Sequence, residues 1–422
     1  MELVREYLER LPKEILELIY LVSDTAEDLG CKVYLVGGFV RDLILGVKNF
    51  DLDVVVEGDG IEFAGKLAEK LNKRFVYHKR FGTATVGDKE FKIDIASARK
   101  ETYEYPASLP KVSFGKISDD LARRDFTINA MAIDISKANF GRLVDQFNGK
   151  KDLEKRLIRI LHDLSFSDDP TRILRAIRFK ERFNFKFEKK TLRLLKEAVK
   201  ENFLERVNPH RLRDELILIL KETHPLRCIY RIKRICGFKF IHPELALKDL
   251  GFLKKTEKMI SWFKKNLPRE RELDSWLIYL IGLLDTLEKK QIIFVLRSFA
   301  FRKGERKRVI SYKERIDSVI KKLKEKVLSP HQIFKILEPL SYEVIVSVLA
   351  KTSQKVVIKR IEDFLKVYNK TKISVRGSDL KDLGVIPGPE FKRILRQTLY
   401  RKINGMIKTK EEEIQFLRSK IK

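Results

Sequence analysis

The sequence predicts an N-terminal domain of the α/β (α+β) class followed by a part built of helices alone. Over residues 1–150, short β-branched runs that fit strands alternate with stretches of helical periodicity, and this mixture is typical of a sheet covered by helices. From residue 152 onward, almost every segment has the apolar spacing of an amphipathic helix. The 422 residues exceed one average domain, so we expect two to four domains.

The elements expected in the N-terminal part follow one another closely. Apolar residues at helical spacing predict helices over 2–28, 39–46 and 60–73. Short runs bounded by turn residues predict strands at 31–36, 51–57, 74–78, 83–87 and 91–97. The stretch 98–119 contains two prolines and little periodicity, which favours a long loop.

The helical part shows no repeat of fixed period, so a solenoid is not expected. Its most basic segment, residues 301–326, holds 11 Lys and Arg against 4 acidic residues. Such a segment can be a solvated helix face. The charge of the whole chain favours the alternative, a contact surface for RNA or DNA.

The composition predicts a polyanionic partner. Lys and Arg outnumber Asp and Glu by 89 to 60, which gives a net charge of +29. Nucleic acid is the leading candidate because neutralising its phosphates releases counterions, and an acidic membrane surface is the rival. The N-terminus is too charged for a signal peptide, and no apolar run reaches the ~20 residues of a spanning helix. Three cysteines without a CxxC motif indicate no disulfide framework, so we expect a cytoplasmic protein.

Two aspartates in the strand predicted at 51–57 are the first candidate metal ligands. Asp51 and Asp53 are two residues apart, so they share one face of the strand and repel each other. Basic partners could relieve that repulsion, and so could Mg²⁺, which prefers carboxylate and phosphate oxygens. Asp94, on the strand predicted at 91–97, is a third candidate. Three aspartates on adjacent strands could hold two ions, one for an attacking 3′-hydroxyl and one for a leaving pyrophosphate.

A glycine pair and an arginine precede these aspartates. Gly37 and Gly38 lack a Cβ, so their backbone N–H groups can approach phosphate oxygens where a helix begins. Arg41 follows one turn later and could form a forked bond to phosphate. A tight turn with a surface arginine is the plain alternative. The combination of glycines, arginine and paired carboxylates within seventeen residues favours a triphosphate site.

The stretch from Arg123 to Asp134, RRDFTINAMAID, places three charged residues before an apolar segment. Arg123, Arg124 and Asp125 could form a surface patch. Their position favours a polar cluster at the edge of the sheet. Asn129 lies inside the apolar segment and needs hydrogen-bond partners there.

These stretches, read in order, resemble a known family. From Val36 to about Leu220 the chain is similar to the class II tRNA nucleotidyltransferases and bacterial poly(A) polymerases. The motifs that carry the similarity are GGFVRDLILG, DLD, RRDFTINAMA, VDQFNGKKDL and DDPTRILRAIRF. The resemblance implies a nucleotidyltransferase head with a five-stranded mixed sheet (1–150), then a helical neck (151–225), body (226–330) and tRNA-binding tail (331–422).

The resemblance also implies roles for single residues. Two Mg²⁺ ions would be bound by Asp51 and Asp53, and Asp94 sits where a further catalytic carboxylate is expected. The triphosphate would be met by Gly37, Gly38 and Arg41, and sugar and phosphate by Arg124 and Asp125. Asn129 would hold the fold, and residues 145–153 would form a springy segment between head and neck.

DDPTRILRAIRF resembles the motif with which the family reads a nucleobase. Asp168 replaces the usual glutamate, and Asp169 and Arg172, three residues apart, are expected to share a helix face. An intrahelical ion pair is the plain alternative. If the pair reads the base, the carboxylate accepts a hydrogen bond from the amino group of cytosine or adenine, and the guanidinium donates one to the ring nitrogen. Uracil and guanine present the opposite donor pattern and would be rejected.

Further residues of this region are assigned with the same motif. Arg175 and Arg178, one and two turns beyond Arg172, could line the same cleft or bind the primer. Arg213 and Glu215 belong to a last motif and are expected to be structural.

The predicted activity is template-independent transfer of CMP or AMP from CTP or ATP to the 3′-hydroxyl of tRNA. Family members add CCA, CC, only the terminal A, or poly(A). Residues 97–112 resemble a flexible loop of CCA- and A-adding members, which disfavours CC addition. Residues 57–71 resemble long multidomain relatives that divide CC and A addition between two proteins, so the chain is either a piece of such a protein or a short member.

Two other classes of protein remain as alternatives. A non-catalytic RNA-binding relative would be expected to lack Asp51, Asp53 or Arg41, and all three are present. An antibiotic nucleotidyltransferase would not need the charge of +29. Residues 375–414 resemble the family's tail, whose glycine and proline turns, with the basic segment 301–326, would hold the acceptor and TΨC arms of tRNA.

Overall fold

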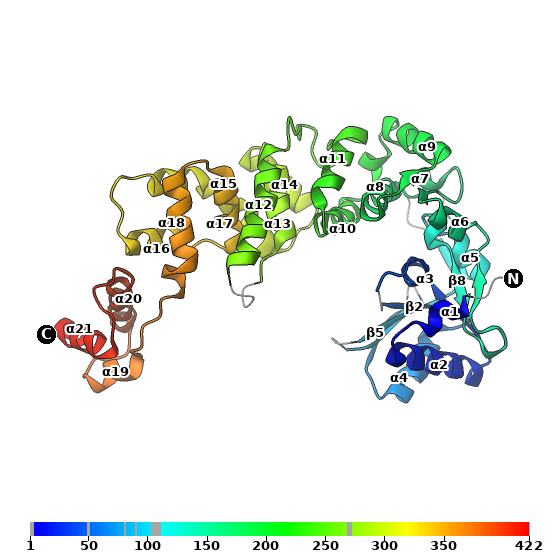
Figure 1. Cartoon of the computed structure of the whole chain (residues 1–422), viewed down its shortest axis with the longest axis horizontal. Coiled ribbons are helices and arrows are strands. Elements are labelled where there is room, and N and C mark those ends of the chain that lie inside the picture. The colour runs from blue at the N-terminus through cyan, green and yellow to red at the C-terminus, as the bar shows by residue number, and fades with distance from the viewer. Residues whose placement is uncertain are drawn as a thin grey trace. The chain divides into compact units, whose positions relative to one another are not determined.

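The computed structural model describes residues 4–48, 51–79, 82–88, 91–102, 111–267 and 272–421. Contacts within the chain divide it into two compact units. Unit 1 comprises residues 1–215 with 234–236, and unit 2 comprises 216–233 with 237–422. Figure 1 labels the elements of both units, and each unit is described by itself.

Unit 1 contains a mixed sheet, which confirms the predicted fold class. Its strand order is β3-β4-β5-β2-β1-β8-β9 over the described residues. Strands β2 and β5 pair in parallel, and the other neighbours pair antiparallel. The strands are β1 (Lys32–Val36), β2 (Leu52–Glu57), β3 (Phe75–His78), β4 (Thr83–Gly87), β5 (Lys92–Ser97), β8 (Ala132–Asp134) and β9 (Arg142–Val144).

The sheet therefore has seven described strands, two more than the resemblance implied. The additional strands, β8 and β9, have three residues each. Three residues are too few to show the alternation by which a strand is recognised in a sequence. They extend the sheet beyond β1, because β8 pairs with β1 and β9 pairs with β8.

Two further expectations for unit 1 were wrong in part. The helix predicted over 2–28 is two helices, α1 (Arg5–Glu9) and α2 (Lys13–Asp28), because Pro12 interrupts the backbone hydrogen bonds. The loop predicted over 98–119 contains an antiparallel hairpin, β6 (Arg99–Thr102) with β7 (Lys111–Phe114), and the start of α5 (Ile117–Ala122). Both strands are largely exposed, so no apolar alternation marked them. Half of the flexible loop predicted over 97–112, residues 103–110, lies outside the described residues.

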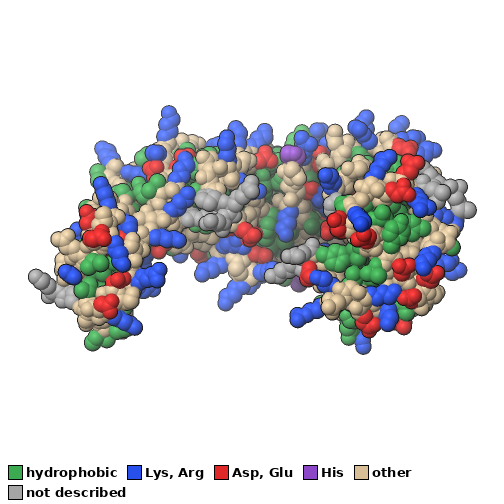
Figure 2. Space-filling view, turned by 60° about the horizontal axis from the view of Figure 1, so that its bottom comes forward, with side chains coloured by type: hydrophobic (Ala, Val, Ile, Leu, Met, Phe, Trp, Pro, Cys, Tyr) green, Lys and Arg blue, Asp and Glu red, His purple; other side chains and the backbone are tan. Residues whose placement is uncertain are grey.

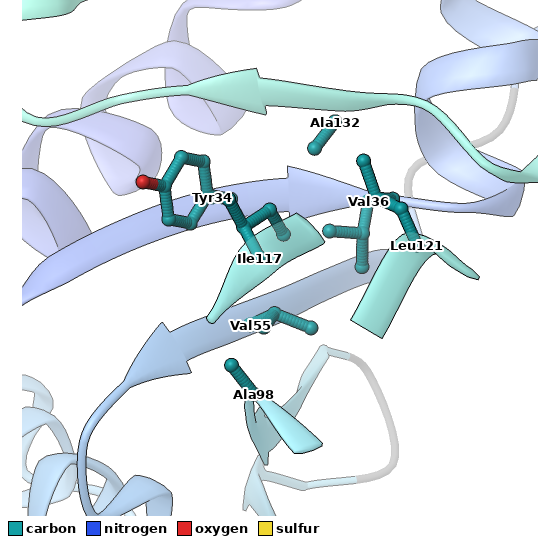
Figure 3. Packing of buried hydrophobic residues seen from close by; sticks show 7 residues of the cluster. All are labelled: Tyr34, Val36, Val55, Ala98, Ile117, Leu121 and Ala132. Atoms are coloured by element: carbon teal, nitrogen blue, oxygen red, sulfur yellow. The ribbon is translucent and has the colours of Figure 1, made fainter. Parts of the chain in front are cut away.

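One apolar cluster positions the charged stretch that follows α5. Figure 3 shows Ile117 and Leu121 of α5 facing Tyr34 and Val36 of β1 and Val55 of β2. Each of these side chains is at most 8% exposed. Because α5 ends at Ala122, burial of its apolar face against the sheet places the arginines that follow it above the strands.

Helices complete unit 1 together with one parallel pair of two-residue strands, β10 (Leu157–Ile158) and β11 (Lys186–Phe187), which interrupts the all-helical part expected from residue 151. On the face of the sheet that carries Leu52 and Ile93 lie α2 and α4 (Gly60–Leu71), whose N-terminus is capped by Asp59. α3 (Gly38–Ile44) follows β1 directly. The remaining elements are η2 (Thr127–Asn129), η3 (Lys137–Asn139), α6 (Gly149–Glu154), β10 (Leu157–Ile158), α7 (Ser165–Asp168), α8 (Thr171–Phe183), β11 (Lys186–Phe187), α9 (Lys189–Lys200), η4 (Phe203–Arg206) and α10 (Pro209–Leu220). The last of these crosses the boundary between the units.

Unit 2 consists of helices throughout its described part, as predicted. They are α11 (Pro225–Ile235), α12 (Gly251–Asn266), α13 (Ser275–Leu284), α14 (Lys289–Ser298), α15 (Lys303–Leu323), α16 (Pro330–Leu337), α17 (Tyr342–Lys351), α18 (Lys355–Lys366), η5 (Tyr368–Lys370), α19 (Gly377–Asp382), α20 (Pro389–Ile403) and α21 (Lys410–Ile421). The helix α13 is buried along its whole length. None of the described helices has the length and apolarity needed to span a bilayer.

Candidate active site

The sheet brings the predicted carboxylates together on one face. Asp53 of β2 lies beside Asp94 of β5 in the parallel pair, and Asp94 lies beside Thr85 of β4. Partners in register point to the same face, so these three side chains form one row. Asp51 stands one residue before β2 and is exposed. The predicted strands therefore placed Asp53 and Asp94 on one face, whereas Asp51, predicted in the same strand as Asp53, lies just before β2.

The pKa of the Asp53 carboxyl is shifted strongly by its surroundings. Burial raises its pKa to about 6; Arg124 opposes that rise, whereas Asp94 and Asp51 add to it. A divalent cation would relieve this repulsion directly. Among the described residues, no group of three His, Cys, Asp or Glu side chains is arranged to hold a metal. The neighbouring carboxylates of Asp53 and Asp94 suit Mg²⁺, which takes one or two carboxylates and completes its shell with phosphate and water.

Asp94 has two partners on the sheet. The Thr85 hydroxyl donates to its Oδ1 at 2.7 Å, and Lys92 Nζ donates to its Oδ2 at 2.8 Å. The Lys92 and Asp94 side chains are 51% and 43% exposed, so this end of the site is open to solvent.

Gly37 is favoured by its backbone conformation and lies beneath an arginine side chain. Its φ is +65°, a conformation that other residues rarely adopt, and a Cβ there would lie 2.5 Å from Arg124 Nη1. The same arginine lowers the pKa of Asp53. The glycine turn thus makes room for the Arg124 guanidinium at the edge of the carboxylate row.

Arg41 lies inside unit 1 and is only 4% exposed. Its Nε and Nη2 both bond Asp42 Oδ1 at 2.8 Å, and its Nη1 donates to Asn129 Oδ1 at 2.7 Å. Its guanidinium carbon lies 4.6 Å from the centre of the Phe183 ring. The forked edge that we expected to meet phosphate is bound to Asp42 in this conformation.

Arg123 and Arg124 share a buried anion that the sequence analysis missed. Asp120, with no exposed surface, accepts from Arg123 Nε at 2.9 Å and from Arg124 Nη2 at 2.8 Å. Burial alone would raise the pKa of Asp120, but the two arginines outweigh it and lower the pKa. The spacing of three and four residues on a helical segment was the available signal.

Asp125 and Asn129 form the polar cluster expected at the sheet edge. Asn129 Nδ2 donates to Asp125 Oδ1 at 2.9 Å, and Arg175 bonds Asp125 Oδ2 through Nε at 2.8 Å and Nη2 at 2.7 Å. Arg175 Nη1 continues to Glu215 Oε1 at 2.8 Å, and Arg178 Nη2 lies 3.4 Å from Glu215 Oε2. The result is a continuous buried network of charges from the sheet to α10.

The expectation that Asp169 and Arg172 share a helix face was wrong. Pro170 holds the preceding residue in an extended conformation, so Asp169 lies outside α8, which begins at Thr171. Asp169 Oδ1 accepts from the Thr171 hydroxyl at 2.6 Å and pairs with Arg211 at 2.7 Å.

Arg172 is buried and held by groups outside its helix. Its Nη1 donates to Ser165 Oγ at 2.7 Å and its Nη2 to the Arg123 carbonyl at 2.8 Å. The side chain is therefore fixed by α7 and by the backbone of the RRD stretch. Asp168, which stands where the family usually has glutamate, lies 3.9 Å from His162, and burial raises the pKa of the Asp168 carboxyl.

All nine residues predicted to bind nucleotide line one cavity of about 580 Å³, a size typical of ligand sites. They are Gly37, Gly38, Arg41, Arg124, Asp125, Asp169, Arg172, Arg175 and Arg178. The lining also includes Asp53, Glu101, Arg123, Asn129, Phe179, Arg182 and Arg211. Its eight arginines face four acidic side chains, so the cavity is suited to a polyanion.

A second cavity of about 390 Å³ lies over the carboxylate row. Asp94 and Thr85 line it, together with Asp53, Arg123 and Arg124, which also line the first cavity. The two cavities therefore adjoin at Asp53 and the arginine pair. This places a basic pocket next to a candidate cation site.

Two family models match the chain. The model described as the poly(A) polymerase head domain matches residues 33–159. The model described as the probable RNA- and SrmB-binding site of polymerase A matches residues 184–248.

Curated relatives of two lengths match nearly the whole chain. The A-adding tRNA nucleotidyltransferase of Geobacter sulfurreducens is 35% identical over 98% of this chain, which spans 48% of that relative. The enzyme of the same name from Halalkalibacterium halodurans is 35% identical over 97% of this chain and 93% of its own length. The chain thus spans about half of one relative and nearly all of the other.

Solved structures also match this chain, and the match extends along this chain and along the chain of each solved structure. A CCA-adding enzyme in an apo form superposes with a TM-score of 0.77 at 35% identity, covering 100% of each chain. The Thermotoga maritima CCA-adding enzyme complexed with tRNA has a TM-score of 0.73 at 34% identity, and a CCA-adding enzyme with ATP has 0.75 at 33%; both matches cover 100% of each chain.

Proposed function

Since the chain belongs to the family of A-adding and CCA-adding tRNA nucleotidyltransferases, we propose that it transfers nucleotides from ATP or CTP to the 3′-hydroxyl of tRNA without a template. The resemblance of its motifs to this family is confirmed by relatives that match over nearly the whole chain. The observation that carries the proposal is the cavity that gathers all nine nucleotide-binding candidates beside the carboxylate row.

The arginines of the cavity are placed to bind the triphosphate. Arg124 lies between the glycine turn and Asp53, so a phosphate there would meet a guanidinium and backbone N–H groups together. Arg123 and Arg124 are both anchored on Asp120, which fixes their guanidinium groups before substrate arrives. Preorganised cations of this kind stabilise the charge that develops on a leaving pyrophosphate.

The carboxylate row supplies the cation site. Asp53, with Asp51 and Asp94 beside it, would hold Mg²⁺. When bound, that ion supplies Lewis-acid activation of the attacking hydroxyl and neutralises charge on the phosphates. The chain's own part is to keep Asp53 ionised, with Arg124 lowering its pKa against the effect of burial.

Asp169 and Arg172 are proposed to read the base from the wall of the same cavity. Within the described part of the chain, the bonds of Asp169 all end on Oδ1, so Oδ2 can accept from the amino group of adenine or cytosine. Arg172 is held by Ser165 and the Arg123 carbonyl and presents a fixed donor to the ring nitrogen. Uracil and guanine present the opposite donor pattern and are rejected.

We propose addition of the terminal A as the main activity, because the relatives that match nearly the whole chain are named A-adding enzymes. Addition of the complete CCA end is the second candidate. It is favoured by a solved CCA-adding enzyme with CTP that is 34% identical over the whole of this chain.

The tRNA is proposed to lie along unit 2. In the basic segment 301–326, the exposed cations are Arg302, Lys303, Lys307, Arg315, Lys321, Lys322, Lys324 and Lys326. Figure 2 shows Lys and Arg side chains spread over the face in view, among fewer acidic ones. The tail, 331–422, has its own apolar core of Val375, Leu380, Ile394 and Leu417 and would grip the acceptor and TΨC arms.

The test is incorporation of labelled nucleotide into three tRNAs that end before CCA, after the first C and after CC. Labelling of only the CC-ended tRNA, from ATP, is the expected result. Labelling of all three would identify CCA addition, and long A tails on unrelated RNA would identify a poly(A) polymerase. Absence of transfer to any of these RNAs in Mg²⁺ would contradict the proposal.

A further inference from the structure

A lysine lies among the three carboxylates of the active site. Lys92 is the first residue of β5 and stands two residues before Asp94, so the two side chains share the catalytic face. The register pairs Leu52 with Ile93, and Lys92 and Asp51 are the residues that precede this pair in their two segments. Lys92 Nζ donates to Asp94 Oδ2 at 2.8 Å.

The surrounding charges identify Lys92 as the shared cation of this row. Its pKa is raised first by the hydrogen bond and charge of Asp94, and further by Asp51 and Asp53. Each carboxylate proposed for the divalent ion is therefore also attracted to this ammonium group. The Lys92 side chain is 51% exposed, and ion pairs at such positions contribute little to stability. A stabilising role in the fold is a weak explanation for its place.

The other oxygen of Asp94 has a partner of a different kind. Thr85, opposite Asp94 on β4, donates its hydroxyl to Oδ1 at 2.7 Å. A neutral hydroxyl on an adjacent strand can stay bonded when a cation approaches Oδ2, whereas an ammonium group on that oxygen has to leave. Thr85 therefore orients the carboxylate, and Lys92 occupies the oxygen that a metal would use.

We propose that Lys92 is an internal counter-cation that occupies the carboxylate row when no divalent ion is bound, and that Thr85 is the positioning residue of Asp94. The inference rests on the metal assignment made under the proposed function. A divalent ion has to displace Lys92 from Asp94, so the lysine weakens cation binding to the nucleotide-free enzyme. It also keeps the three carboxylates from repelling one another in that state.

The test is binding of Mn²⁺ to the full chain without nucleotide or tRNA, measured as free Mn²⁺ by electron paramagnetic resonance. Lys92→Met is expected to lower the Kd for Mn²⁺ about fivefold, the effect of removing one charge a few ångströms from a divalent ion in a solvated site. Lys92→Arg keeps the charge and is expected to stay within about twofold of wild type.

Lys66→Met is the matched control for charge. Lys66 is 49% exposed and pairs with Glu69 on α4, on the opposite face of the sheet. The Lys66→Met variant loses the same charge from a similarly exposed ion pair, so its Mn²⁺ binding is expected to stay within about twofold of wild type. Equal binding by Lys92→Met and wild type, or equal tightening by Lys66→Met, would overturn the role of Lys92.

Thr85 is tested by a pair of variants in the same assay. Thr85→Val removes the hydroxyl at nearly constant volume and is expected to raise the Kd for Mn²⁺ about tenfold, as loss of a ligand's supporting hydrogen bond does. Thr85→Ser retains the donor and should restore binding. Unchanged binding by Thr85→Val would overturn the positioning role.

The outcome for wild type separates this inference from the proposed function. Wild type that binds Mn²⁺, with Asp53→Asn binding it much more weakly, supports the metal assignment, and the lysine and threonine variants then decide the inference. Wild type that binds no Mn²⁺ would overturn the inference. Nucleotide incorporation in Mg²⁺ would, in that case, still leave the proposed transfer activity standing.

Discussion

The two adjoining cavities hold their charged side chains in different ways. On the nucleotide side, Arg172 and Arg178 are at most 5% exposed, and Asp120 is fully buried between two arginines. On the cation side, the Asp94 and Lys92 side chains are about half exposed and bond each other, and Asp94 also accepts from Thr85. The candidate nucleotide site therefore holds buried, paired charges, whereas the candidate cation site is open to solvent.

The difference follows from what each side has to do. Reading a base without a template needs donors and acceptors held in place before the substrate arrives, and buried charge pairs provide that rigidity. A cation that enters with each nucleotide needs ligands that are accessible and held by weak bonds.

The largest effect is expected on the cation side, at Asp53. Asp53→Ala removes the central carboxylate of the row, and Asp51→Ala removes its neighbour. Loss of metal-assisted charge stabilisation of several kcal/mol corresponds to a fall in incorporation of about 10³-fold or more. Single-turnover incorporation measures the effect, and circular dichroism checks folding. Near-normal turnover in a folded variant would refute the metal assignment.

A large loss of stability is expected from breaking the buried network on the nucleotide side. Asp125→Ala leaves Arg175 without the carboxylate that holds two of its nitrogens. Arg175 keeps its bond to Glu215 but loses both bonds to Asp125, which should cost about 2–3 kcal/mol of unfolding free energy, measured by denaturant titration. Asp28→Ala, which removes an exposed carboxylate paired with Lys70, is the control and should leave stability nearly unchanged. Equal losses in the two variants would contradict the contrast between buried and open regions.

A smaller, selective effect is expected for Arg172→Ala. Loss of the donor to the ring nitrogen should lower the preference for ATP over GTP and UTP by about 10²-fold, while tRNA binding survives. The measurement is incorporation from each nucleotide into CC-ended tRNA, with tRNA affinity as the control. Unchanged nucleotide preference would remove Arg172 from base reading.

The smallest effect is expected from pH. The pKa of Asp53 is raised by burial to about 6, so the carboxylate is protonated below that pH and ionised above it. A protonated carboxyl binds cations poorly, so Mn²⁺ affinity should fall about tenfold per unit as pH decreases below 6 and level off above 7. Affinity that stays constant between pH 5 and 7 would show that Asp53 is not the titrating ligand.

The positions of the carboxylates and the residues that line the cavity could be predicted from the sequence. Asp53 and Asp94 lie in strands whose alternation is clear, and the predicted strands put them on one face. The nine nucleotide-binding candidates were named from motifs and line one cavity. Local periodicity and motif order were sufficient for both.

Partners from distant segments were beyond that kind of reasoning. Arg211 pairs with Asp169, and Ser165 holds Arg172, through contacts that depend on how α7, α8 and α10 pack. The position of Asp169 outside α8 was readable, because a residue before proline avoids the helical conformation. The hairpin of β6 and β7 could not be predicted from the sequence, because both faces of its strands are largely exposed.

The most direct test of the account is single-turnover incorporation from ATP, CTP, GTP and UTP into tRNA ending in CC, with Mg²⁺, by wild type and by Asp53→Ala. We predict transfer of AMP by wild type, no transfer of GMP or UMP, and no transfer of any nucleotide by Asp53→Ala. Transfer of all four nucleotides at similar rates, or transfer that persists in Asp53→Ala, would contradict it.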